Sequence, residues 1–354
     1  MNTSTSQDDE IQVEEIGCPL CEHDSYGSLA SLVDVTYDIP GDFQVVRCKG
    51  CRHIFLNPRP TLVSILDCYP KEYAPYLDVQ TTASHNGALG QDSPSIPGSV
   101  ERAEGVDADN RDRDRSWRRV PRAILRWLWE ENATLVPNPP RAESRMLEVG
   151  CAHGGFLLEA QRAGWRVEGV EPSTQAARVA RQRGFAVHEG FLGDFPSQDR
   201  ELYDWIAFWM VFEHVPNPRE FLRQARELLR SGGVITLSVP NAATWERWLF
   251  GRHWLGYDAP RHLQVFTASK LRDLLEAEGF REVRVIHQSN TRYWTGSLAS
   301  WGMHWFPNAR WPKTWMGHFK NEPPAWCKWL LLIPGKINAL LELSGRITVE
   351  ARKS

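Results

Sequence analysis

Two glutamates and two glycines in one short stretch have the types and spacing of a site for a nucleotide-type cofactor. Glu148 stands just before Gly150, Gly154 follows, and Glu171 lies further along the chain. Glycines let the backbone turn tightly and approach a ligand that a Cβ atom would meet. A carboxylate about twenty residues beyond such a turn can accept hydrogen bonds from both hydroxyls of a ribose. The pattern therefore predicts a pocket for a cofactor that carries a ribose.

The segments that must position these residues alternate between strand and helix patterns. Residues 146–149 are predicted to form a buried strand, and residues 155–162 a helix whose free N–H groups face the ligand. Further expected strands are 165–171, 185–188, 203–209, 233–239, 281–285 and an antiparallel 347–352, and further helices are 174–183, 219–230 (closed by a glycine cap at 231–233) and 267–278. This alternation predicts an α/β fold with a mostly parallel sheet covered on both faces.

The pattern Glu-x-Gly-x-x-x-Gly at residues 148–154, followed by the stretches 203–215 and 232–241, resembles the class I methyltransferases that depend on S-adenosylmethionine (SAM). The resemblance covers residues 143–290 and implies a Rossmann-like, seven-stranded methyltransferase sheet with SAM as cofactor. It implies that the glycine turn holds the methionine end, that Glu171 holds the ribose and that residues 188–194 line the adenine pocket. The cofactor site expected in this way comprises Glu148, Gly150, Cys151, Gly154, Glu171, Phe191, Leu192, Asp194 and Trp209.

This sequence departs from the family's pattern at two positions of that site. Ala152 stands where the family often has glycine, and Phe191 where many members have a small or acidic residue. A methyl group at position 152 narrows the turn, and Phe191 makes Asp194 a less secure adenine ligand.

Four cysteines near the start of the chain have the spacing of a zinc site. They form two C-x-x-C pairs, Cys18 with Cys21 and Cys48 with Cys51, and together offer the four thiolates of a tetrahedral structural site. Residues 32–37 and 43–47 alternate like short strands, which favours a zinc ribbon. We expect His23 and His53 not to be ligands, and the remaining cysteines, Cys68, Cys151 and Cys327, to be buried as small hydrophobic residues.

A ribbon that ends in residues 53–60, ahead of a SAM domain, is similar to a bacterial group of zinc-ribbon methyltransferases. Members of that group often resemble enzymes that modify sugars, polysaccharides or secondary metabolites. Similar ribbons also precede ribosomal RNA base methyltransferases, so a nucleic-acid substrate stays open as an alternative.

Two histidines are the candidate catalytic residues, because methyl transfer needs a positioned nucleophile and, for some acceptors, removal of its proton. His214 follows the predicted fourth strand, with bracing of the loop as its alternative role, and His262 lies in a polar loop. In that loop Arg261 either clamps an acidic substrate or pairs with Asp258. Ubiquinone-synthesis O-methyltransferases, which are similar at Glu213-His214, hold a metal with a further carboxylate three positions earlier; Met210 stands there, so we expect no catalytic metal.

Composition places the chain among globular proteins. It has 354 residues, 42% of them hydrophobic, and a formal net charge of −3, which gives no overall attraction to nucleic acid. Seven cysteines without a recognisable signal peptide favour a reducing cytoplasm, and the apolar run 329–333 is too short to span a bilayer. The expected location is cytoplasmic, with peripheral membrane contact as an alternative; the oligomeric state is not predicted.

Changes in composition predict the following order of parts: a disordered tail (1–15), the zinc ribbon (16–79), a flexible linker (80–115), the SAM-binding core (116–290), a tryptophan-rich helical cap (291–345) and a final core strand (346–354). Arginines interleaved with apolar residues at 111–128 suit a lid helix or a helix on phosphates or membrane. The cap carries seven of the sixteen tryptophans, which either bind the acceptor or form its own core.

Three functions follow as hypotheses. The first is an enzyme that methylates oxygen, nitrogen or carbon of a small or glycosidic acceptor. The second is an RNA methyltransferase that binds through its ribbon, against which stands the absence of Asn/Asp-Pro-Pro-Tyr and Pro-Cys motifs. The third is a SAM-binding scaffold without catalysis.

Overall fold

The structure is a computed structural model that describes residues 11–70, 73, 136–196, 202–289, 292–320 and 324–354. The expected linker (80–115), the basic segment (111–128) and most of the expected tail (1–15) lie outside the described residues. The same holds for the side chain of Cys327.

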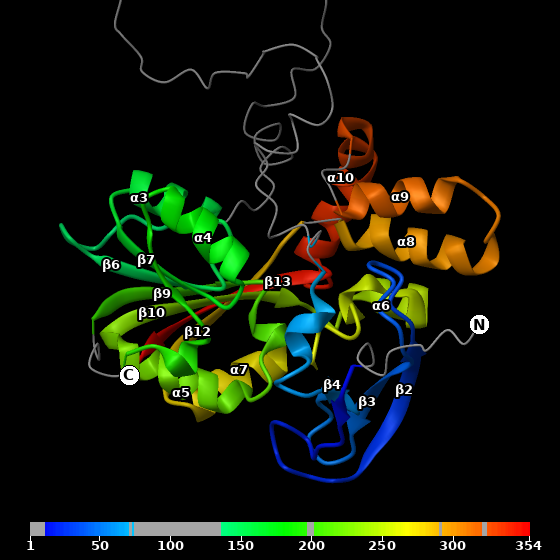
Figure 1. Ribbon diagram of the computed structural model, residues 1–354, viewed down its shortest axis with the longest axis horizontal. Coiled ribbons are helices and arrows are strands. Elements are labelled where there is room, and N and C mark those ends of the chain that lie inside the picture. Colours follow the sequence, from blue (N-terminus) through cyan, green and yellow to red (C-terminus); the bar gives the residue numbers. More distant parts are fainter. Residues whose placement is uncertain (1–10, 71–72, 74–135, 197–201, 290–291, 321–323) are drawn as a thin grey trace, which may run out of the picture.

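A large mixed sheet forms the centre of the molecule (Figure 1). Its strands, in spatial order, are β12 (Phe280–His287), β13 (Arg346–Lys353), β10 (Leu229–Pro240), β9 (Tyr203–Trp209), β6 (Arg145–Val149), β7 (Arg166–Glu171) and β8 (Ala186–Glu189). The five strands from β10 to β8 are parallel, and β13 pairs antiparallel with both β10 and β12. The central strands are almost continuously apolar and buried, as expected for a sheet covered on both faces.

Helices cover both faces of this sheet. Figure 1 shows α3 (Gly155–Arg162) and α4 (Thr174–Gln182) on one face, and α5 (Pro218–Leu228) and α7 (Ala268–Ala277) on the other. The Ser173 side chain caps α4 by accepting a hydrogen bond from the backbone N–H of Ala176, and α5 begins with a proline, whose missing N–H costs nothing at a first helical position. These elements confirm the predicted alternation of strands and helices.

One predicted helix end is wrong. Helix α5 stops at Leu228, and residues 231–233 do not cap it. Leu229 is already extended, fully buried and paired with Tyr203, so burial of its side chain draws the chain into β10 directly. Gly232, with φ of +74°, lies instead in an irregularity where the register of β10 shifts.

The N-terminal residues build a second, smaller sheet in the order β11-β4-β3-β2. Its strands are β2 (Tyr26–Leu32), β3 (Phe43–Cys48), β4 (Ile54–Leu56) and β11 (Gln264–Val265), and a separate pair is formed by β1 (Val13–Glu14) and β5 (Arg59–Pro60). Because β11 comes from the chain after β10, this sheet is joined to the core. Phe55 of β4 and Phe266 beside β11 lie in the same hydrophobic cluster as the core strands.

A strand predicted at residues 32–37 is also wrong, since β2 ends at Leu32. The chain turns there because the buried Asp34 carboxylate accepts hydrogen bonds from the backbone N–H groups of Thr36, Tyr37 and Ile39.

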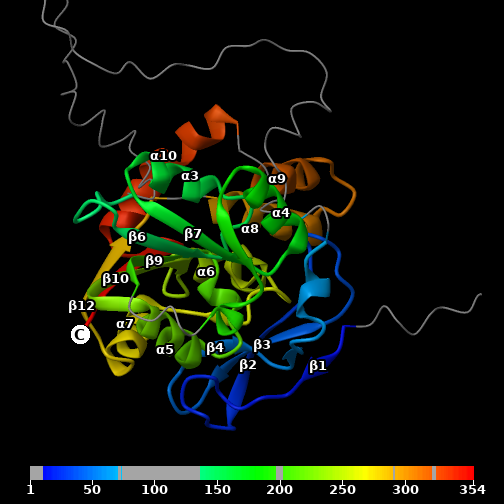
Figure 2. The same cartoon turned by 60° about the vertical axis from the view of Figure 1, so that its left-hand side comes forward.

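Helices α6 (Trp245–Phe250), α8 (Arg292–Trp305), α9 (Trp311–Lys320) and α10 (Ala325–Leu340) form a group beside the core, seen from two sides in Figures 1 and 2. Glycines allow α8 and α9 to pack closely: a Cβ at Gly302 would lie 2.3 Å from the Trp311 ring.

Short 3-10 turns connect other elements of the described residues, namely η1 (Ile65–Cys68), η3 (Leu192–Asp194), η4 (Phe212–His214), η5 (Gly251–His253) and η6 (Leu255–Tyr257). Within the described residues, no helix has both the length and the apolarity to cross a membrane.

Candidate active site

The turn between β6 and α3 has the left-handed backbone that its glycines predict. Gly150 has φ of +74° and Gly154 has φ of +81°. A Cβ at Gly150 would lie 2.4 Å from Val211, and one at Gly154 would lie 2.8 Å from the Phe185 ring. Ala152 also has a positive φ, of +46°, so it takes up in the turn a conformation that glycine adopts without strain.

Glu171, at the end of β7, is fixed against this turn. One carboxylate oxygen accepts the backbone N–H of Ala152 at 2.8 Å, and the other accepts that of Ser173 at 2.8 Å. Burial raises the pKa of Glu171, while the two N–H groups act in the opposite direction. Each oxygen keeps a second lone pair, so the carboxylate remains able to accept two further donors.

Glu148, the last residue but one of β6, is buried with an oxygen that has no protein partner. Its side chain lines a cavity, and its Oε2 makes no hydrogen bond among the described residues. Burial, followed by the nearby charge of Glu171, raises the pKa of Glu148 well above its ordinary value. A buried acceptor without a donor is costly, so this atom marks a place where a ligand's positive or donor group fits.

The Glu148 and Glu171 carboxylates line a cavity of about 720 Å³, a size in the range of small-molecule sites. Of the predicted cofactor residues, those that line it are Glu148, Gly150, Cys151, Glu171, Phe191, Leu192, Asp194 and Trp209. Gly154 is not part of the lining, and the structure gives it a role in the turn alone. Asp194 accepts the backbone N–H of Phe191, which shapes the η3 turn over this end of the cavity.

The other half of the same cavity is built by three separate parts of the chain. The N-terminal part contributes Tyr37 and Tyr69, the helices beside the core contribute Tyr293 and Phe319, and the first residue of β13 contributes Arg346. No sequence pattern marked these residues as site residues, because they meet only through tertiary packing. The two predicted catalytic histidines, His214 and His262, both line this half.

Hydrogen bonds fix the tautomer of both histidines. Nδ1 of His214 lies 2.9 Å from the carbonyl oxygen of Arg261, and Nδ1 of His262 lies 3.0 Å from that of Gly256. A carbonyl oxygen only accepts, so each Nδ1 carries the hydrogen and each Nε2 presents a lone pair. The hydroxyl of Tyr69 also lies 2.8 Å from Nδ1 of His214.

Both imidazoles are held neutral. Burial, and next the neighbouring His262, lower the pKa of His214 to about 3. Burial also lowers the pKa of His262, against the opposing charge of Asp258. The two rings lie edge to face with centroids 4.8 Å apart.

Arg261 pairs with carboxylates and does not line the cavity. Its guanidinium is fully buried and donates to Asp34 at 2.7 and 2.9 Å and to Asp258 at 2.7 and 3.0 Å. Of the two alternatives for Arg261, the structure therefore supports the ion pair over the substrate clamp. Sequence reasoning missed Asp34, which lies 227 residues away.

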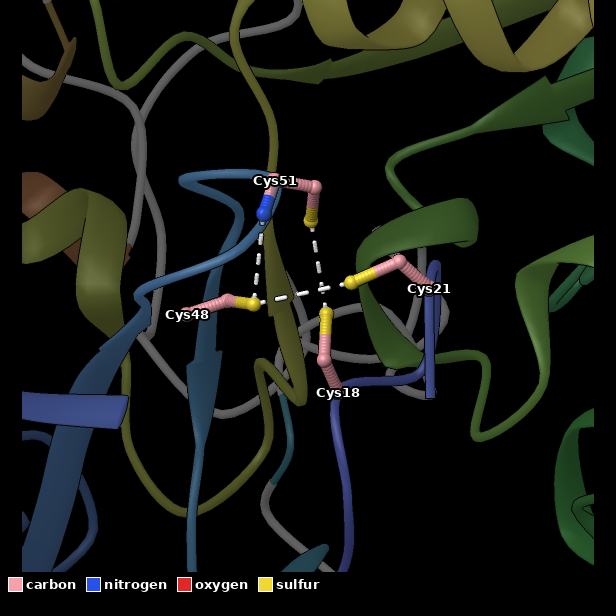
Figure 3. Close-up of side chains that lie close together, drawn as sticks. All are labelled: Cys18, Cys21, Cys48 and Cys51. Carbon is pink, nitrogen blue, oxygen red and sulfur yellow. Dashed lines mark hydrogen bonds between the residues drawn. The ribbon is translucent and has the colours of Figure 1, made fainter. Parts of the chain in front are cut away.

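The four N-terminal cysteines converge, as Figure 3 shows. The Sγ atoms of Cys18 and Cys51 are 3.5 Å apart, and those of Cys21 and Cys48 are 3.6 Å apart. Four sulfurs each about 2.3 Å from a zinc ion would be roughly 3.8 Å from one another, so the cluster has the dimensions of a zinc site. His53 is hydrogen-bonded to Gln264 instead of joining the cluster.

Comparison with known proteins agrees with this geometry. Residues 110–285 match a family model described as "Methyltransferase domain". The ubiquinone biosynthesis O-methyltransferase of Glaesserella parasuis is 32% identical over 108 residues, 27% of this chain and 45% of the relative. A "Probable S-adenosylmethionine-dependent methyltransferase" of Mycolicibacterium smegmatis is 32% identical over 141 residues, 38% of this chain and 51% of the relative.

A solved SAM-dependent methyltransferase from Thermotoga maritima aligns with 66% of this chain and 96% of its own, at 17% identity and a TM-score of 0.42. The chain spans about half the length of the curated relatives it matches first. The family match and the curated relatives show that the core of this chain is similar to SAM-dependent methyltransferase domains.

Proposed function

We propose that the protein transfers the methyl group of SAM to a small-molecule acceptor held in the other half of the same cavity. One observation carries this proposal: the carboxylates of the glycine turn and the pair of neutral histidines line a single cavity. A cofactor and an acceptor bound side by side there would need no further conformational step to meet.

In this proposal the two carboxylates divide the cofactor between them. Glu171 accepts hydrogen bonds from the ribose hydroxyls through its remaining lone pairs. Glu148, whose Oε2 has no protein partner, receives the ammonium group of the methionine end. Phe191, Leu192 and Asp194 bound the adenine end, and Trp209 forms the rim towards the acceptor.

The reaction is a displacement at the sulfonium methyl carbon. A lone pair of the acceptor forms the new bond to carbon while the carbon–sulfur bond breaks and S-adenosylhomocysteine leaves. His214 and His262 each present an Nε2 lone pair at the acceptor half, so both can accept a hydrogen bond from an acceptor hydroxyl or amine. With a pKa of about 3, His214 suits orientation of the acceptor better than full removal of its proton at neutral pH.

The lining of the acceptor half supports a ring-shaped acceptor. Five aromatic side chains line it, namely Tyr37, Tyr69, Tyr73, Tyr293 and Phe319. Aromatic faces with phenolic hydroxyls suit sugars and aromatic rings, which combine flat apolar surfaces with polar edges. The relatives named for ubiquinone biosynthesis favour a small molecule in the same way. We further propose that the four clustered cysteines bind one structural zinc ion.

Calorimetric titration of SAM tests the proposed cofactor site. The wild-type protein should bind SAM, and Glu171→Gln should weaken binding about 10- to 100-fold, because charge-assisted hydrogen bonds contribute roughly 1.5–3 kcal/mol. Glu168→Gln is the matched control: it lies on the same strand but pairs with Arg145 outside the cavity lining. Thermal unfolding of each variant checks that the turn is intact. A folded wild-type protein that fails to bind SAM would refute the proposal.

A further inference from the structure

Three potential metal ligands meet at the wall of the acceptor half, away from the cysteine cluster. Glu213 and His214 belong to the η4 turn after β9, and His262 belongs to the loop after η6. One ligand atom from each of the three lies within 4.8 Å of the others. Apart from the cysteine cluster, this is the one such group among the described residues.

The hydrogen bonds of the two histidines prepare both rings as ligands. Each Nδ1–H donates to a backbone carbonyl, which leaves Nε2 as the lone-pair atom and fixes the ring orientation. Metal-bound histidines characteristically donate their second ring N–H to such an oxygen.

Glu213 lacks the partners that a buried carboxyl group requires. Its side chain is fully buried, and neither carboxylate oxygen makes a hydrogen bond among the described residues. Oε1 lies 3.9 Å from Nε2 of His262, which is too far for a hydrogen bond. Asp258, also 3.9 Å from that nitrogen, is already paired with Arg261. Even with the charge of Arg346 nearby, a buried carboxyl group that has no hydrogen-bond donor and lies beside the ring of His262 leaves a place for a cation.

We propose that Glu213, His214 and His262 bind a divalent transition-metal cation, with Zn²⁺ the first candidate. Two imidazoles and one carboxylate are a donor set that suits zinc and leaves a coordination position open. Ligand atoms about 2.0–2.1 Å from a tetrahedral ion lie roughly 3.4 Å apart. The Glu213–His262 separation is 3.9 Å and all three ligand atoms lie within 4.8 Å of one another, so a bound ion has to draw them together by about 0.5 to 1.4 Å.

This site differs from the one that the sequence excluded. The expectation of no catalytic metal depended on Met210, which replaces a carboxylate in the same turn. The third donor is instead His262, brought to Glu213 by the loop that the Arg261 ion pairs hold in place. Both histidines line the acceptor half, so an ion held by them would adjoin the acceptor. This role rests on the proposed function, whereas metal binding itself does not.

Metal counting on the full-length protein tests the site without an acceptor. After incubation with ZnCl₂ and exhaustive dialysis, elemental analysis should find two equivalents of zinc in the wild type and one in Glu213→Gln and in His262→Gln. His287→Gln, a control on β12 outside the cavity lining, should keep two. Cys48→Ser should lose the other equivalent.

A Co²⁺-substituted sample reports which site is filled. The cysteine cluster should give intense thiolate charge-transfer bands, and the second equivalent only weak visible bands of nitrogen and oxygen ligation, absent in His262→Gln. One equivalent in the wild type, or two retained in folded His262→Gln, overturns the proposal. SAM titration of the same samples separates the outcomes: metal lost with SAM binding intact leaves the proposed cofactor site standing, whereas two metals without SAM binding refutes only the proposed function.

Discussion

The buried Arg261 ion pairs can be tested with a single substitution, because replacing Arg261 removes all of them. Arg261→Met keeps most of the side-chain volume but leaves Asp34 and Asp258 without their counter-charge, and their side chains are only 1% and 14% exposed. Breaking a buried ion pair by removing one partner costs about 3–5 kcal/mol. With an unfolding entropy of about 2.1 cal/mol/K per residue over 354 residues, the expected loss in Tm is roughly 4–7 °C.

The matched control is Arg166→Met. Arg166 pairs with Glu143 at the surface, where the side chains are 62% and 67% exposed, so its loss should cost no more than about 1 kcal/mol. Thermal unfolding followed by circular dichroism measures both variants against the wild type. Equal Tm values for the two variants would refute the reasoning.

The pH dependence of Arg261→Met is a second readout. In the wild type, burial alone would raise the pKa of Asp258, but the charge and hydrogen bonds of Arg261 bring it to about 2. A carboxyl with a lowered folded-state pKa stabilises the fold above its ordinary pKa, and that contribution is lost as pH falls towards 2. Without Arg261, burial raises the pKa of Asp258, and the pH dependence of stability changes sign: the variant loses stability as pH rises. Its Tm deficit should therefore be larger at pH 7.5 than at pH 5, and an equal deficit at both would contradict the assignment.

Three further predictions concern the cofactor turn and the cysteine cluster. Gly154→Ala should destabilise the protein by about 1–3 kcal/mol, since the φ of Gly154 is +81° and an added Cβ would collide with Phe185. Ala152→Gly should preserve or slightly raise Tm. The opposite order of the two Tm values would contradict the left-handed backbone at these positions. SAM binding should release protons near neutral pH, because the raised pKa of Glu148 keeps this carboxyl group protonated until the ammonium group of SAM binds beside it. Calorimetry in buffers of different ionisation enthalpy measures the proton release. Binding heats that do not depend on the buffer would exclude it. Chelation of zinc should lower Tm by several degrees in the wild type and by clearly less in Cys48→Ser, since that variant has already lost the cysteine site and keeps only the ion proposed at Glu213; equal losses in the two proteins would show that the cysteine-bound ion is not structural.

The elements of the core were predictable because their signals are local. The apolar runs of β6 and β9 and the glycines at 150 and 154 act on neighbouring residues, so periodicity and left-handed turns could be recognised in the sequence. The cluster of four cysteines was also predictable, because two C-x-x-C pairs each fix half of it.

The acceptor half was not predictable, because its residues are joined by packing alone. Asp34 contacts Arg261 at a separation of 227 residues in the sequence, and Tyr69 contacts His214 at a separation of 145. No sequence pattern in these segments indicates which residue each one contacts. The pairing of Glu213 with His262 depends on the loop that Arg261 fixes. The misplaced end of α5 has the same origin, since burial of Leu229 outweighed the glycines that follow it.

A crystal structure of the protein with SAM would show whether one cavity holds both the cofactor and the acceptor. We expect the ribose hydroxyls within hydrogen-bond distance of Glu171, the ammonium group at Glu148, and the sulfonium methyl group directed towards His214 and His262. SAM bound at another place, or with its methyl group directed away from the two histidines, would contradict the claim that one cavity holds both the cofactor and the acceptor.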